Sequence, residues 1–150
     1  MRLPIQVAIF IVRPTGDTGR EYLMLHRVLK RMSFWQPVTG GVESGETVEQ
    51  TAARELHEET GFRPDDLKSI DHTYTFPPDD FFKDIYETEP DEIRVHVFVA
   101  QVSADSEPTL DPVEHDQHCW MDYDGAMNRL HWWDDKESLK RVDAFLDEGV

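Results

Sequence analysis

At 150 residues with 39% hydrophobic side chains, the chain is large enough for one folded domain with a sizeable core, and we expect residues 1–150 to form a single domain. Its 31 acidic residues outnumber 15 basic ones, for a formal net charge of −16. Broad binding to nucleic acid or to an anionic membrane needs clustered Lys and Arg, so neither partner is expected. The single cysteine, Cys119, excludes an intramolecular disulfide and fits the reducing cytoplasm.

The first predicted elements are strands. Ile5–Val12 and Glu21–His26 are β-prone runs joined by a loop rich in turn residues, which predicts a hairpin. The first run is too short and too interrupted to be a secretory or membrane segment. Trp35–Val38 predicts a short strand that leads into a glycine-bearing loop, Gly40–Glu46.

A helix is predicted directly after this loop, over Thr47–Thr60. Thr47 is the expected N-cap, and Gln50 completes a Thr-x-x-Gln capping box. Gly61 stands where a left-handed C-terminal cap is expected.

Three carboxylates, Glu55, Glu58 and Glu59, lie along one edge of the apolar stripe of this helix at roughly 100° per residue. They crowd its C-terminal half, where the macrodipole and like-charge repulsion each disfavour anions by a few tenths of a kcal/mol. Stability alone does not select that arrangement, whereas a hard cation such as Mg²⁺ takes oxygen ligands. The alternative is a solvated acidic helix, which the adjoining glycines and the single internal Arg54 disfavour.

The rest of the chain predicts more strands and a second helix. Leu67–Phe76, Ile93–Val102 and a stretch near His118–Asp122 are the expected strands, and Asp134–Glu148 has the apolar spacing of an amphipathic helix. Residues 77–92 are acidic and contain three prolines, which predicts an exposed excursion, either a lid or a loop. Strands with helices on both sides make an α/β/α sandwich.

The segment around the first helix fits a known pattern with no position missing. It runs Gly40, five residues, Glu46, seven residues, Arg54-Glu55-Leu56, one residue, Glu58-Glu59, one residue, Gly61-Phe62. This resembles the Nudix box, and therefore the Nudix hydrolases. The resemblance implies an α/β/α sandwich with a mixed central sheet. It also implies Mg²⁺, with Mn²⁺ as the alternative, held by Glu55, Glu58 and Glu59. Arg54 and Glu46 would brace the loop against the helix.

A second similarity extends from Ser33 to Gly40 (SFWQPVTG), which resembles the dihydroneopterin-triphosphate and dATP pyrophosphohydrolases of the Nudix family. Further on, Glu114-His115 followed by Trp120 resembles their distal acid segment. This resemblance implies Glu114 as a further metal ligand and candidate base. It also implies a group of residues near the triphosphate: Arg27, Thr39, Gly40 and Arg2.

Two side chains near the box each have two interpretations from the residues alone. Arg27 belongs to the only dense basic group, and it is either a phosphate contact or a surface salt bridge. Trp35 either stacks on a base or pterin or packs in the core. Phe34 is expected in the core. Trp132 and Trp133 have the same two interpretations as Trp35: they either offer an aromatic face to a ligand or pin the last helix to the sheet.

The expected reaction is hydrolysis of a nucleoside or pterin triphosphate to the monophosphate and pyrophosphate by metal-activated water. Glu59 or Glu114 would take the water proton. The alternatives within the enzyme class are a dinucleoside polyphosphate hydrolase and an RNA 5′-end pyrophosphohydrolase, the second disfavoured by the net acidity. From another class, a non-catalytic nucleotide-binding regulatory domain is disfavoured because no acid of the box is replaced.

Overall fold

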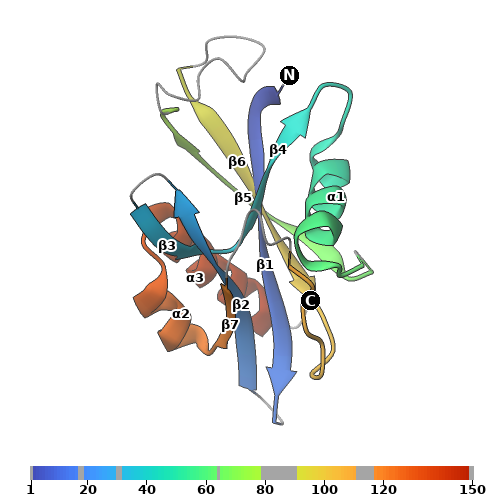
Figure 1. Ribbon diagram of the computed structural model, residues 1–150, viewed down its shortest axis with the longest axis vertical. Helices are drawn as coiled ribbons and strands as arrows, with labels where there is room; N and C mark the ends of the chain where they lie inside the picture. The colour runs from blue at the N-terminus through green and yellow to red at the C-terminus, as the bar shows by residue number, and fades with distance from the viewer. Residues whose placement is uncertain are drawn as a thin grey trace.

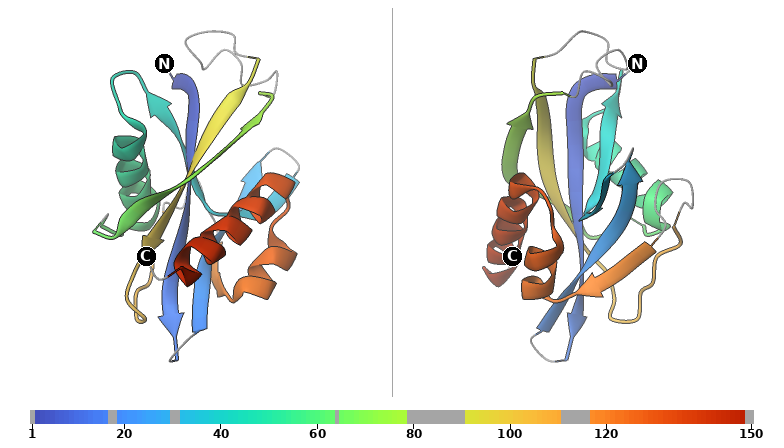
Figure 2. Two further views of the ribbon diagram at one scale, coloured as in Figure 1. Left: turned by 180° about the vertical axis from the view of Figure 1, so that it is seen from behind. Right: turned by 60° about the vertical axis from the view of Figure 1, so that its left-hand side comes forward.

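The computed structural model describes residues 2–16, 19–29, 32–63, 65–78, 91–110 and 117–148. These residues form one seven-stranded mixed sheet in the order β3-β2-β1-β6-β5, with β4 paired to β1 and β7 paired to β2. The elements are β1 (Arg2–Thr15), β2 (Gly19–Leu29), β3 (Met32–Gln36), β4 (Val38–Glu43), α1 (Val48–Thr60), β5 (Leu67–Phe76), β6 (Ile93–Gln101), β7 (Gln117–Met121), α2 (Tyr123–Arg129) and α3 (Trp133–Asp147). Helix α1 covers one face of the sheet, and α2 and α3 cover the other (Figures 1 and 2).

Strand β1 is the centre of the fold because both of its edges are paired and both of its faces are covered. It runs parallel to β6 on one side and antiparallel to β4 and β2 on the other. Val7 and Ile9 contribute to the core cluster beneath α1, whereas Phe10 and Val12 contribute to the cluster beneath α2 and α3. This alternation with a period of two explains why residues 7–12 form a continuous apolar run.

The expected fold class is confirmed, and so are most of the predicted elements. The hairpin forms, with Ile11 opposite Leu23. Helix α1 begins after the N-cap Thr47 with the full capping box, and it ends at Gly61 in the left-handed conformation, with φ of 75°. Helix α3 lies within one residue of its predicted limits.

The strand predicted over Trp35–Val38 is wrong, because this stretch belongs to two strands. Pro37 separates β3 from β4, and since proline has no amide N–H it interrupts the pairing there. β3 then pairs with β2, and β4 pairs with β1. Gly40 and Gly41 consequently lie within β4 and not in a loop, and in this stretch only Gly45 has a positive φ, at 89°.

Two further differences concern the C-terminal part. Helix α2 was not predicted, because it has only seven residues, includes Gly125 and buries Ala126 alone. Trp133 does not pin α3, since it is 73% exposed. Trp132, 45% exposed, does contact the buried Phe34 edge to face, with ring centroids 5.8 Å apart.

The excursion predicted over residues 77–92 lies mostly outside the described residues, which break off between 78 and 91. None of the described helices is long and apolar enough to cross a membrane.

Candidate metal and phosphate site

Helix α1 buries two of its three candidate carboxylates. Glu55 is 9% exposed and Glu59 is 3% exposed, on the side of α1 that packs against the sheet. The side chain of Glu58 is 57% exposed, so it lies further from the apolar stripe than the sequence pattern indicates. Burying ionisable carboxyl groups in this way is costly unless they are neutralised by partners or by a bound cation.

Arg54 is the cationic centre of this region. Its Nε and Nη2 donate to the two oxygens of Glu46 at 2.8 and 2.9 Å, and Nη2 also donates to the Gly41 carbonyl at 3.1 Å. Its Nη1 donates to Glu55 Oε1 at 2.8 Å and to Glu58 Oε2 at 3.3 Å. One guanidinium therefore joins strand β4, the loop before α1 and two of the helix carboxylates.

Glu46 is held on several sides. Besides Arg54, it accepts hydrogen bonds from the Glu43 amide and the Thr51 hydroxyl, both at 3.0 Å. The hydrogen bond from Arg54 is the main reason that the pKa of Glu46 falls to about 2. The hydrogen bond to Glu46 in turn raises the pKa of Arg54. The loop 44–47 is thereby clamped to α1 by a charge-assisted, bidentate pair.

Gly40 allows α1 to approach β4 closely at Glu55. A Cβ added at Gly40 would lie 2.2 Å from both Cγ and Cδ of Glu55 and 2.6 Å from its Oε1. The requirement for glycine here is thus steric, because the Glu55 carboxylate occupies the space that a side chain would fill.

The donor set of α1 fits Mg²⁺ or Mn²⁺ in its chemistry, since it offers carboxylate oxygens and a cradle that seats Glu55 against the backbone of β4. Within the part of the chain that the structure describes, no three acidic, His or Cys side chains converge as they stand to hold an ion. Glu55 and Glu58 are turned to Arg54 instead. To hold an ion, both carboxylates would leave the Arg54 guanidinium and bind the metal.

The candidate substrate contacts lie on other strands. Thr39 is half-buried in β4 beside Gly40, opposite Ala8 of β1. Arg27 and Trp35 lie on the β2–β3 hairpin, which Figure 1 shows away from α1. Among the described residues Arg27 has no ion pair, and the half-buried Trp35 packs on the core cluster beneath α3 and on His26, with ring centroids 5.0 Å apart.

Two of the predicted site side chains cannot be placed. Glu114 lies outside the described residues, and for Arg2 the structure describes only the backbone, which pairs with Glu43.

Sequence reasoning missed an anchor near the predicted distal segment. Arg13 donates to Glu107 at 2.7 Å and to the Ser106 carbonyl at 3.0 Å, and its guanidinium lies 4.0 Å from the ring centroid of Trp120. The hydrogen bond from Arg13 lowers the pKa of Glu107, which also accepts from the Trp120 indole. Arg13 is separated from Ser106 and Glu107 by more than 90 positions, so no local pattern predicts these contacts.

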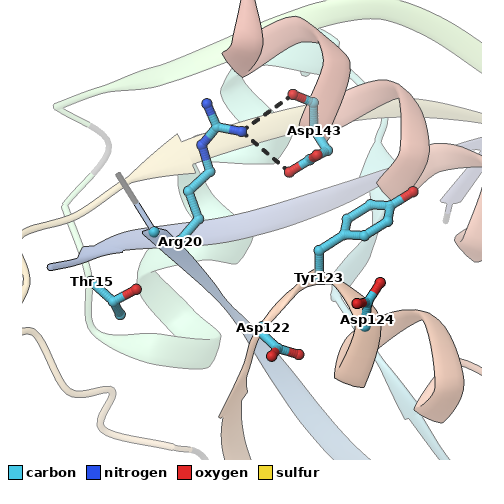
Figure 3. A pocket seen from close by; sticks show the side chains of 7 residues that line it. Thr15, Arg20, Asp122, Tyr123, Asp124 and Asp143 are labelled. Atoms are coloured by element: carbon cyan, nitrogen blue, oxygen red, sulfur yellow. Dashed lines mark hydrogen bonds and ion pairs between the residues drawn. The ribbon is translucent and has the colours of Figure 1, made fainter. Parts of the chain in front are cut away.

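A cavity of about 330 Å³ lies near the β1–β2 turn (Figure 3), and none of its lining residues comes from α1. Its labelled lining residues are Thr15, Arg20, Asp122, Tyr123, Asp124 and Asp143. Arg20, its one lining cation, is paired with Asp143 at 3.3 Å. With three carboxylates around that cation, this cavity does not suit a polyphosphate.

The family model described as NUDIX domain matches residues 4–142. The chain therefore belongs to the NUDIX family.

Two curated relatives and one solved structure are among the proteins that are similar to most of the chain. It is 34% identical over 138 residues to the octanoyltransferase of Myxococcus xanthus, a match that covers 92% of this chain and 36% of that protein. The chain thus spans about a third of the length of that relative. It is 30% identical over 138 residues to the dihydroneopterin triphosphate diphosphatase of Haemophilus influenzae, covering 89% of this chain and 85% of that protein. The E. coli dihydroneopterin triphosphate pyrophosphohydrolase superimposes with a TM-score of 0.77 at 25% identity, covering 93% of this chain and 94% of that one.

Proposed function

We propose that this chain is a divalent-cation-dependent pyrophosphohydrolase that converts a nucleoside or pterin triphosphate to the monophosphate and pyrophosphate. The observation that carries the proposal is the seating of buried Glu55 against Gly40, within the Arg54 network. Such an arrangement supports the proposal because it holds a ligand-type carboxylate against the strand backbone, within reach of a cationic side chain. The two similar diphosphatases support the triphosphate, because the chain covers most of the length of each.

Glu55, Glu58 and Glu59, with Glu114 as a further candidate, would hold Mg²⁺ or Mn²⁺. When bound, such a cation neutralises phosphate charge and makes water more acidic. The pair of Arg54 and Glu46 would hold the loop before α1 in a fixed position relative to the helix. Arg54 would pair with Glu55 and Glu58 until the cation binds.

The reaction requires water to add to phosphorus while the bond to the leaving phosphate oxygen breaks. One carboxylate must take the water proton, and the two candidates are Glu59, which is buried, and Glu114. Arg27, Thr39, Gly40 and Arg2 would contact the polyphosphate, with the Arg27 guanidinium able to bind phosphate oxygens in pairs. Trp35 is proposed to stack on the heterocycle. The single cysteine is also in keeping with a reducing cytoplasmic location.

The test compares Glu59→Gln with Glu49→Gln, a matched control because Glu49 is an exposed acid on the first turn of the same helix. Triphosphate hydrolysis is followed with Mg²⁺ and with excess chelator. Glu59→Gln and the chelator should each lower turnover by orders of magnitude, on the order of a hundredfold or more, and Glu49→Gln should not. Full turnover by Glu59→Gln, or in chelator, contradicts the proposal.

A further inference from the structure

A buried threonine of α1 contacts the Arg54 network but has no part in the chemistry proposed above. Thr51 lies near the start of α1 and is fully buried. Its hydroxyl lies 3.0 Å from Glu46 Oε1 and 3.1 Å from the Thr47 carbonyl oxygen, so both atoms are within reach as acceptors. The Thr47 carbonyl already accepts from the Thr51 amide at 3.0 Å. Since Glu46 is a carboxylate, it is the stronger of the two acceptors.

One oxygen of Glu46 accepts hydrogen bonds from three segments of the chain around the loop 44–47, which joins β4 to α1 (Figure 1). Oε1 accepts from the Glu43 amide at the end of β4 and from the Thr51 hydroxyl, both at 3.0 Å. It also accepts from Nη2 of Arg54 at 2.9 Å. Two long side chains such as Glu46 and Arg54 can move as a pair. The strand amide and the buried hydroxyl therefore fix where the pair lies.

The stiffness of threonine suits this role. A β-branched side chain has few χ1 rotamers in a helix, and those of threonine allow Oγ1 to reach the carbonyl of the preceding turn. At Thr51 the same position also brings Oγ1 to Glu46. A valine there would keep the shape of the side chain and remove the donor.

A second buried threonine of α1 provides a comparison. Thr60 is 1% exposed, and its hydroxyl donates to the Leu56 carbonyl, four residues earlier, at 2.6 Å. Thr51 has the equivalent contact with the Thr47 carbonyl. A backbone acceptor of this kind is enough to satisfy a buried hydroxyl. Burial alone therefore does not require the contact between Thr51 and Glu46, which distinguishes the two threonines.

The position of Glu46 determines which donors of Arg54 remain for the helix carboxylates. Nε and Nη2 of Arg54 face Glu46, and Nη1 donates to Glu55 and Glu58. The guanidinium is a rigid, planar group of five N–H donors. If Glu46 were less firmly held, this group could turn toward Glu55 and Glu58 and pair with them more strongly. A divalent cation would then compete less well for the same two carboxylates.

We propose that Thr51 is a positioning residue for the metal site and acts through Glu46. By holding Glu46 in place, its hydroxyl limits the hold of Arg54 on Glu55 and Glu58 and leaves both carboxylates available to a divalent cation. The inference rests on the proposed function, in which these carboxylates hold Mg²⁺ or Mn²⁺. Removal of the hydroxyl should therefore weaken cation binding beyond any effect on the stability of the fold.

The experiment is calorimetric titration of the full chain with Mn²⁺ alone, in the absence of any nucleotide. Thr51→Val should raise the Mn²⁺ dissociation constant about threefold to tenfold, because the lost hydrogen bond is to a charged group and part of its free energy reaches the metal site. Thr51→Ser, which restores the hydroxyl, should lie within about twofold of wild type.

Thr60→Val is the matched control, since it removes a buried hydroxyl from the same helix without touching Glu46. Thermal unfolding without metal should show that it destabilises the protein at least as much as Thr51→Val does, because the Thr60 hydroxyl also accepts from the Phe62 amide. Its Mn²⁺ dissociation constant should nevertheless lie within about twofold of wild type.

A double-mutant cycle tests the route through Glu46. Glu46→Gln should itself weaken Mn²⁺ binding. In that background Thr51→Val should have less than about a twofold further effect, because residues that act through one contact are not additive. A full additional loss in the double variant would overturn the inference.

The inference would also be overturned by a Thr51→Val dissociation constant within twofold of wild type, by an equal loss of affinity in Thr60→Val, or by failure of Thr51→Ser to restore binding. If Thr51→Val does not fold, Thr51→Ala and Thr60→Ala replace the two valine variants. The expected binding without triphosphate hydrolysis by the wild type would refute the proposed function and leave this inference standing. Normal hydrolysis with Mn²⁺ binding that does not depend on Thr51 would refute this inference alone, and a wild type that binds no Mn²⁺ would refute both.

Discussion

Gly40→Ala should separate the catalytic role of Glu55 from its role in stability. The added Cβ would lie 2.2 Å from Glu55 Cγ and Cδ, whereas carbon atoms in contact are about 3.5–4.0 Å apart. Glu55 must therefore move by more than about 1 Å, and its 2.8 Å hydrogen bond to Arg54 would be lost. A hydrogen bond to a charged group contributes about 1.5–3 kcal/mol, which the better strand propensity of Ala offsets by about 0.5–1 kcal/mol. The net loss should be about 1–2 kcal/mol.

Turnover should fall much more than this loss of stability, because displacing a reacting group by about 1 Å costs on the order of a hundredfold. The assays are triphosphate hydrolysis at saturating Mg²⁺ and thermal unfolding. Gly16→Ala is the control: Gly16 has φ of 58° and no heavy atom within 4 Å of an added Cβ, so alanine there costs about 1–2 kcal/mol through the backbone alone. Equal turnover by Gly40→Ala and Gly16→Ala at equal Mg²⁺ would refute the reasoning.

The other predictions concern charge. The pKa of Glu46 falls from 4.5 to about 2 on folding, so its stabilisation is present above pH 4.5 and is lost as the pH falls through about 2. Denaturant unfolding should show Glu46→Gln about 1–2 kcal/mol less stable at pH 7, with a smaller difference at pH 3. The pKa of Asp135 rises from 3.8 to about 7 on folding, so the stability that the protein loses by burying this carboxyl group is lost between those two pH values. Asp135→Asn should therefore gain stability relative to wild type between pH 4 and pH 8, by up to about 4 kcal/mol, and a pH-independent difference would count against a buried, neutral Asp135. Arg27→Ala should raise KM more than it lowers kcat, and unchanged kinetics would show that Arg27 is a surface residue that does not contact the phosphates.

Helix α1 was predictable because its signals are local. Thr47 and Gln50 form the capping box three residues apart, and Gly61 ends the helix in the conformation that glycine favours. The division of residues 32–43 into two strands was not, because it depends on which distant strands supply partners to each side of Pro37. The local strand propensity of these residues does not determine which strands they pair with.

The same distinction applies to the sites. The helical spacing of Glu55 and Glu59 predicts that they share a buried edge. It does not predict that Glu55 packs so closely on Gly40 that an added methyl group would collide with it. Asp134-Asp135 at a helix start is typical of solvated acids that favour the macrodipole. Only the packing of α3 on Tyr74, 61 residues earlier, reveals that Asp135 is buried.

The most direct test of the central claim is identification of the bond that is broken. A triphosphate, such as dGTP, dATP or dihydroneopterin triphosphate, is incubated with the protein and Mg²⁺ in ¹⁸O water, beside a dinucleoside tetraphosphate. The account predicts monophosphate and pyrophosphate from a triphosphate, with the dinucleotide spared, and the position of the label identifies the phosphorus attacked. Inorganic phosphate as the sole small product, or preference for the dinucleotide, would contradict it.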